Sequence, residues 1–179
     1  FAIFLAKRKI LLRTVLTLSS ILLIAGIFSY QLANRSTARV SILDVDDGIS
    51  VVVTANRQTA IIGCNAYSDY TTYQYLKGHG IHNIDYLQPL SDETIEYQNL
   101  AKLNEKFQTK NFILPNGQYF AGDLEKSLEE VEKISYYEKS AKTILNDDVT
   151  IELHSDAKGN YTVLMVKEIR ILILSSEYD

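Results

Sequence analysis

The sequence predicts a layered α+β domain that is preceded by one transmembrane helix. An uncharged stretch runs from Thr14 to Ala33, and after it short β-branched runs outnumber helical patterns. This mixture favours a domain of sheets and helices over a helical bundle or a pure β-sandwich. Hydrophobic residues make up 46% of the 179 residues and prolines number only two, which excludes a low-complexity or collagen-like chain. The one cysteine, Cys64, cannot form an intramolecular disulfide, so a packed core must stabilise the domain.

The uncharged stretch has the length of a membrane span. Its twenty residues, 14–33, would form a helix about 30 Å long, which matches the hydrocarbon core of a bilayer. A cleaved signal peptide is the alternative, but the apolar region of such a peptide usually has only about 7 to 15 residues. The sequence therefore predicts a transmembrane helix at 14–33, a linker at 34–39 and a domain at 40–179.

The distribution of charge predicts the orientation. Four cations precede the stretch and two follow it: Lys7, Arg8, Lys9, Arg13, then Arg35 and Arg39. The positive-inside bias places residues 1–13 in the cytoplasm and residues 40–179 outside it, at the cell membrane. Because the sequence opens on apolar residues without a methionine, residues 1–13 are expected to be the cytoplasmic flank or the end of a preceding membrane segment. The first 39 residues carry a formal charge of +6 and the remaining 140 carry −10.

The first half of the domain alternates strands with one helix. β-branched runs predict strands at 40–45, 50–54, 59–62 and 84–87. The first two strands flank Asp46-Asp47-Gly48, which predicts a tight turn. A helix is expected over 70–77, ended by Gly78-His79-Gly80.

The second half begins with a longer helix. Ser91 is expected to cap a helix over 92–108, whose Leu100 and Leu103 fall on one face. A strand at 112–114 follows, and then an acidic segment whose apolar residues have helical spacing: Leu124, Leu128, Val131 and Ile134. The tail predicts three more strands, at 149–154, 161–166 and 169–174.

Residues 43–50, at the first predicted turn, carry the most specific signal. They read LDVDDGIS, and the pairs GI and ID follow at 80–81 and 84–85. This order resembles the C-terminal metallo-β-lactamase-like domain of the ComEC family, which consists of polytopic bacterial membrane proteins of competence and DNA uptake. Members of that family have the sequence L-D-V-G-Q-G-D-S at this place, after a membrane helix. The matching residues are Leu43, Asp44, Val45, Gly48, Ser50, Gly80, Ile81 and Asp85. The resemblance covers nearly the whole chain and implies an αββα sandwich, incomplete here because the family's domain continues further.

The metal-binding motif of that family is degenerate in this sequence. Its members place H-x-D-x-D-H after the I-D strand, because imidazole and carboxylate ligands hold the catalytic ion. The matching stretch is Ser91-Asp92-Glu93-Thr94-Ile95-Glu96, which lacks both histidines and one carboxylate. The family's I-D-T-G is replaced by Ile62-Gly63-Cys64-Asn65, and its late T-G-D by Ser175-Ser176-Glu177. We therefore expect no metal at Ser91, Glu93, Ile95, Glu96 and Glu177, although two glutamates could offer oxygen to Mg²⁺ or Ca²⁺.

Other candidate residues have ordinary structural interpretations. His79 and His82 lack a third ligand nearby and are expected to be loop histidines. Asp44, Asp46 and Asp47 lack the spacing of a calcium loop and are expected to be turn residues. Cys64 is expected to be a small buried side chain and not a nucleophile. Tyrosines could stack on single-stranded bases, but the acidic domain favours packing roles for them: Tyr67, Tyr70, Tyr73, Tyr75, Tyr136 and Tyr137.

The resemblance implies a non-catalytic extracytoplasmic domain, a pseudoenzyme, of a ComEC-like membrane protein that takes part in DNA uptake during competence. Its partners would be other membrane segments of the same protein and, through the parent channel, single-stranded DNA. No cofactor is expected. Two alternatives stay open: a metal-dependent nuclease or hydrolase of the metallo-β-lactamase superfamily, and a membrane-anchored partner-binding module unrelated to DNA.

Overall fold

The computed structural model describes residues 2–33, 37–45, 48–65, 68–116, 128–129, 131–156 and 159–175. The chain divides into two compact units, Phe1–Thr37 and Ala38–Asp179. We call the second unit the body. It begins with a strand at Ala38, two residues before the predicted start of the domain.

The first unit contains the helix α1, Ala2–Ala33, which includes the predicted span at 14–33. The helix continues without a break through the predicted boundary after residue 13. Its large apolar side chains between Val15 and Phe28 are exposed. Among the described residues, no helix has the length and apolar character needed to cross a membrane. The structure therefore does not support the transmembrane part of the fold prediction.

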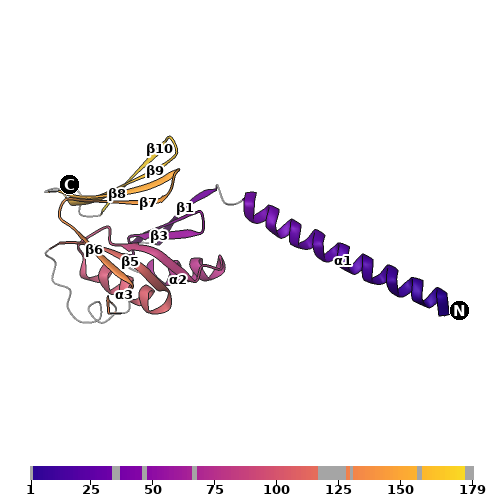
Figure 1. Ribbon diagram of the computed structural model, residues 1–179. Coiled ribbons are helices and arrows are strands. Elements are labelled where there is room, and N and C mark those ends of the chain that lie inside the picture. Colours follow the sequence, from indigo (N-terminus) through magenta and orange to yellow (C-terminus); the bar gives the residue numbers. More distant parts are fainter. Residues whose placement is uncertain are drawn as a thin grey trace. The chain divides into compact units, whose positions relative to one another are not determined.

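The body is built on a mixed six-stranded sheet in the order β1-β2-β3-β4-β5-β6, which we call sheet A (Figure 1). Its strands are β1 Ala38–Val45, β2 Gly48–Ala55, β3 Gln58–Ile62, β4 Asn83–Gln88, β5 Gln108–Pro115 and β6 Lys133–Tyr137. β1, β2 and β3 pair antiparallel, whereas β4, β5 and β6 are added in parallel. Parallel neighbours need crossover connections, which here contain helices after β3 and after β4. The carboxyl ends of β3 and β4 consequently meet at one edge, where Ile62 pairs with Gln88.

A second sheet, sheet B, has four antiparallel strands in the order β10-β9-β8-β7. Its strands are β7 Ser140–Asn146, β8 Val149–Asp156, β9 Gly159–Val166 and β10 Ile169–Leu174. The three strands predicted in the tail are confirmed as β8, β9 and β10. β7 was not predicted, because its few apolar residues do not alternate with polar ones along the strand. Burial does alternate: Thr143 and Leu145 are buried, while Lys142 and Ile144 are exposed.

Helices and sheets form three layers. The helices α2, Ser68–Gly78, and α3, Thr94–Lys106, cover one face of sheet A, and sheet B covers the other (Figure 1). Alternation along β2 and β3 explains this, because neighbouring side chains point to opposite faces. The helix-side core includes Val52, Ile61, Leu76, Leu100 and Leu103, and the core between the sheets includes Val51, Val53, Ile62, Ile151 and Leu164. Within the described residues of the body, no helix covers the outer face of sheet B, so three of the four predicted αββα layers are present in this part of the chain.

Gly80 ends helix α2 in a left-handed conformation, with φ +67°. The N–H of Ile81 donates to the carbonyl of Leu76 over 2.9 Å, and the N–H of Gly80 donates to that of Lys77 over 3.1 Å. This pair of bonds is a Schellman motif, which satisfies carbonyls that the helix leaves free. The motif residues Gly80 and Ile81 therefore have a structural role: Gly80 turns the chain, and Ile81 packs against the helix-side core.

Two predictions about helices are wrong in part. Helix α3 starts after Glu93, not after Ser91, and it ends at Lys106 because β5 begins at Gln108. Ile134, which was assigned to a helical pattern, lies in strand β6, because parallel pairing with β5 extends this segment. Within the predicted helical pattern from Leu124 to Ile134, residues 124–127 and 130 lie outside the described residues.

Candidate degenerate metal site

The stretch that replaces the metal motif forms the connection from β4 into α3. Ser91 is buried, with 1% of its surface exposed. Glu93 is the N-cap residue of α3 with extended backbone, and its side chain makes no capping bond. Ile95 projects into solvent, with 41% exposed, whereas Glu96 is fully buried. Ile95 thus points away from the two buried positions, Ser91 and Glu96.

Glu96 is the centre of this connection. Its Oε1 accepts hydrogen bonds from the N–H groups of Leu90, over 2.7 Å, and Cys64, over 3.1 Å. Its Oε2 accepts from the N–H of Ser91, over 2.8 Å, and from the Ser91 hydroxyl, over 2.5 Å. One carboxylate therefore joins the end of β3, the end of β4 and the first turn of α3.

This geometry does not fit a bound metal ion. Both oxygens of Glu96 accept two hydrogen bonds each, and the hydroxyl of Ser91 is used by the same carboxylate. Ile95 has no donor atom. Glu177 lies outside the described residues, and within the described part of the chain no three metal-ligating side chains gather. Because a catalytic zinc site usually has three protein ligands, these residues do not supply one.

Burial governs the ionisation of this region. It raises the pKa of Glu96 above its ordinary value, while the three N–H donors and the Ser91 hydroxyl oppose that rise by favouring the carboxylate. Burial also raises the pKa of Tyr97, and it raises that of Tyr137 to about 12. The negative charges of Asp92 and Glu96 add to both tyrosine shifts. Both tyrosines therefore stay neutral at physiological pH.

Asp92 links this connection to sheet B. Its Oδ1 accepts a hydrogen bond from the side-chain amide of Asn160, at the start of β9, over 3.0 Å. The N–H of Ser175 donates to the carbonyl of Asn160 over 3.1 Å, which adds the end of β10 to the same group. Ser175, the one residue at the place of the family's late T-G-D motif that the structure describes, is thus linked through Asn160 to Asp92, just before α3.

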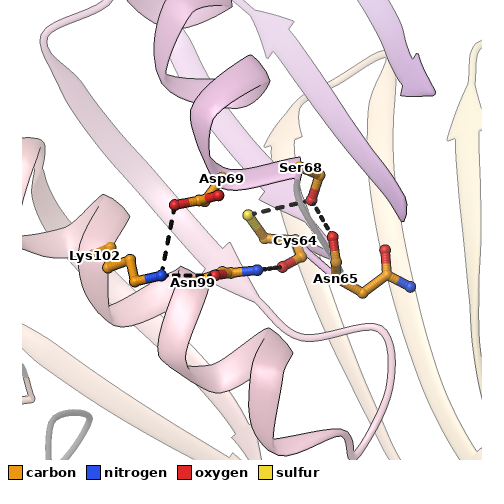
Figure 2. Close-up of polar contacts among 6 residues, drawn as sticks. All are labelled: Cys64, Asn65, Ser68, Asp69, Asn99 and Lys102. Atoms are coloured by element: carbon orange, nitrogen blue, oxygen red, sulfur yellow. Dashed lines mark hydrogen bonds and ion pairs between the residues drawn. The ribbon is translucent and has the colours of Figure 1, made fainter. Parts of the chain in front are cut away.

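A second polar cluster surrounds Cys64, between the two helices (Figure 2). The Ser68 hydroxyl donates to the carbonyl of Asn65 over 2.7 Å, and its oxygen lies 3.5 Å from the sulfur of Cys64. The Asn99 amide donates to the carbonyl of Cys64 over 3.0 Å. Lys102 donates to Asn99 and lies 3.7 Å from a carboxylate oxygen of Asp69.

This cluster does not activate the thiol. Cys64 is fully buried, and burial raises its pKa to about 12. Because the thiolate is the nucleophile, such a thiol is inert. The predicted interpretation of Cys64 as a small buried side chain agrees with this position, and the side chains around it hold β3 against α2 and α3.

The other retained motif residues are structural. Leu43 packs against the helix-side core, and Ser50 opposite it is fully buried. Asp85 accepts a hydrogen bond from the N–H of Thr59 over 2.8 Å and lies 2.6 Å from the ammonium group of Lys110. Asp44 and Val45 end β1, and Gly48 starts β2.

His79 and His154 take part in ring contacts outside the metal-motif stretch. His79 stacks on Tyr75 at 4.0 Å, beside the end of α2, and His154 stacks on Tyr161 in sheet B. Tyr75 also shares a 2.6 Å hydrogen bond with the hydroxyl of Ser41. Asp46, Asp47 and Tyr67 also lie outside the described part of the chain.

Sequence reasoning missed two arrangements. The buried role of Glu96 has a weak signal, since it is the third residue of its helix, where a glutamate often reaches back toward the preceding backbone. The second is a cluster of Tyr73 with Lys77 and Lys106, whose ammonium groups lie 5.7 Å and 4.7 Å from the ring centroid. No sequence signal joins Lys106 to the other two, because it comes from a different helix.

No family model and no curated protein matches the sequence. Among solved structures, a metallo-β-lactamase with a HARLDQ motif from Cronobacter sakazakii is similar, with a TM-score of 0.57 and 10% identity over 84% of this chain and 63% of that one. The metallo-β-lactamase MIM-1 from Novosphingobium pentaromativorans has a TM-score of 0.50 and 10% identity, over 74% of this chain and 59% of that one. Diflavin flavoprotein A 5 from Nostoc sp. PCC 7120 has a TM-score of 0.51 and 14% identity, over 76% and 66%.

The chain spans less than two thirds of the length of each of these proteins. At sequence identities of 10% to 14%, these structural similarities show a common fold and nothing finer. They confirm the metallo-β-lactamase-like part of the prediction, and they do not show the ComEC family. The chain has a metallo-β-lactamase-like fold.

Proposed function

We propose that the body is a non-catalytic metallo-β-lactamase-like module, which binds or supports a partner without a metal ion. This proposal rests on the hydrogen bonds that the carboxylate of Glu96 accepts. At the position where the resembling family has a metal-binding histidine, this chain has a carboxylate whose two oxygens already accept four hydrogen bonds. A ligand that is so engaged would have to break buried bonds before it could bind an ion.

Metal analysis of the purified full chain tests this proposal. After incubation with Zn²⁺ or Mn²⁺ and gel filtration, we expect substoichiometric metal by mass spectrometry. The variant E93A removes the acid at the one aspartate position of the motif that keeps a carboxylate, and E105A removes an exposed carboxylate from helix α3 as a matched control. Stoichiometric metal that E93A loses and E105A keeps would favour the alternative, a metal-dependent nuclease or hydrolase.

A second candidate function is contact with single-stranded DNA, as the resemblance to ComEC proteins implies. The specific observation in its favour is the cluster of Tyr73, Lys77 and Lys106. Among the described residues, neither lysine has a carboxylate partner, although residues 40–179 carry a net negative charge. Cations beside aromatic rings are the combination that binds single strands.

Fluorescence anisotropy with a labelled single strand tests this contact. We expect binding that weakens as salt rises, because cation contacts to phosphates release counterions. The variant K77A/K106A should weaken binding, whereas K142A, on sheet B and paired with Glu152, should not. Binding that neither salt nor K77A/K106A changes would contradict a contact through these lysines, and no binding at all would favour a partner-binding module unrelated to DNA.

The cellular location is a further part of the proposal. We place the chain at the cell membrane with residues 40–179 extracytoplasmic, alongside other membrane segments of a ComEC-like protein. This placement is supported by the uncharged stretch at 14–33 and its cationic flanks, and by no feature of the structure. Protease added to spheroplasts should digest the body, and a body cleaved only after lysis would reverse the orientation.

A further inference from the structure

Three backbone N–H groups and one hydroxyl point to a single buried place at the edge of sheet A. The N–H groups belong to Cys64, Leu90 and Ser91, and the hydroxyl belongs to Ser91. We call this group the donor nest. Cys64 follows β3 and Leu90 follows β4, so the nest forms only when these parallel strands are paired.

The nest favours an acceptor with two oxygens. Backbone N–H groups can only donate, and here they approach from the ends of two different strands. A carboxylate presents two oxygens that accept and do not donate, whereas an amide would place an NH₂ group against one of the N–H groups. Glu96 supplies that carboxylate with none of its surface exposed.

Position 63 offers another route into the same nest. A Cβ atom at Gly63 would lie 3.5 Å from Oε1 of Glu96 and 3.2 Å from Cβ of Leu90. A carboxylate carried there would compete with Glu96 for the same donors. The ComEC-like pattern has an aspartate at this position, and this chain has Gly63, whose φ of +73° suits glycine.

We infer that the donor nest is a carboxylate-binding site whose resident ligand is the side chain of Glu96, and that it binds a free small carboxylate when this side chain is removed. The inference deepens the proposed function and rests on it, since both require Glu96 to remain inside the protein. It assigns to Glu96 a positioning role that replaces metal ligation.

Chemical rescue of E96A tests the inference. Acetate has the carboxylate and the one carbon that E96A removes beyond Cβ. In the full chain, we expect acetate to raise the melting temperature of E96A by more than about 3 °C, a shift of the size that one regained buried interaction gives in a chain of this length. Chloride at equal ionic strength and neutral acetamide should not do so. E105A and the unmodified chain should show no acetate-specific rise. Folded E96A that responds equally to acetate and chloride would overturn the inference.

A second pair of variants covers the case in which E96A does not fold. G63D/E96A places a carboxylate beside the nest from the other side, and G63A/E96A has the same backbone strain without the carboxylate. We expect G63D/E96A to be the more stable of the two, and equal stability would contradict the inference. Metal content of the same samples separates the two proposals, because stoichiometric metal in the unmodified chain defeats the proposed function, whereas absent rescue defeats only the nest.

Discussion

The side-chain amide of Asn160 donates a hydrogen bond to the carboxylate of Asp92 over 3.0 Å, joining residues that lie 68 positions apart. Asn160 is 7% exposed, so its amide has little access to water as an alternative partner. We expect N160A to lower the free energy of unfolding by about 1 kcal/mol, because it removes this hydrogen bond while the carboxylate of Asp92 is exposed and can still be solvated.

The conservative variant D92N separates this bond from a general loss of packing. Its amide oxygen can still accept from Asn160, so chemical denaturation should show a smaller loss than for N160A. A loss in D92N that equals or exceeds that in N160A would show that the negative charge, and not the hydrogen bond, matters.

Asp85 in β4 connects β3 and β5 through Thr59 and Lys110, and its contact with Lys110 makes the stability of the body depend on pH in the alkaline range. The hydrogen bond from Lys110 to Asp85 raises the pKa of the lysine. A raised pKa in the folded state stabilises the body below the ordinary lysine pKa, and this contribution is lost as pH rises through the folded value. Melting temperatures measured from pH 8 upward should fall less steeply for K110M than for the unmodified chain.

The same carboxylate has a second role that does not depend on pH in this range. It accepts the N–H of Thr59, which is buried. D85A should therefore cost about 1–3 kcal/mol at pH 7, more than K110M, because Lys110 is exposed and can be solvated. Equal stability of D85A and K110M at pH 7 would contradict this assignment.

Gly80 and Gly78 form a matched pair at the end of helix α2. Neither has an atom within 4 Å of an added Cβ, so space does not distinguish them, but only Gly80 has a positive φ. We expect G80A to destabilise the body by about 1 kcal/mol and G78A to stabilise it by up to about 1 kcal/mol. Thermal unfolding of both variants checks the opposite signs, and the same sign for both would refute the Schellman motif as the cause.

Cys64 should be unreactive in the folded protein. Because burial raises its pKa to about 12, almost no thiolate is present at pH 8. A thiol reagent should label the native chain slowly and the denatured chain at once. S68A removes the hydroxyl that contacts the sulfur and serves as the control, because the thiol stays buried without it and should still be labelled slowly. Fast labelling of the native unmodified chain would show an open path to the thiol.

The sequence predicted the regular pattern of the body more fully than its site. Strands such as β10 and β8 were found because alternation or β-branched runs mark them locally. β6 was missed because its strand conformation depends on pairing with β5, and β7 was missed because it has few apolar residues. The loss of metal ligands could be read from Ser91 and Ile95 directly. That Glu96 turns inward could not, because its donors come from Cys64 and Leu90, 32 and 6 residues away.

The bond between Glu96 and Cys64 also has a consequence for the folding pathway. It can form only after β3 and β4 have been brought together and α3 has docked, so it depends on contacts that are distant along the chain. Interactions that form after the rate-limiting step leave the refolding rate unchanged and slow unfolding. If its hydrogen bonds form after that step, the carboxylate of Glu96 slows the unfolding of the body and leaves its refolding rate unchanged.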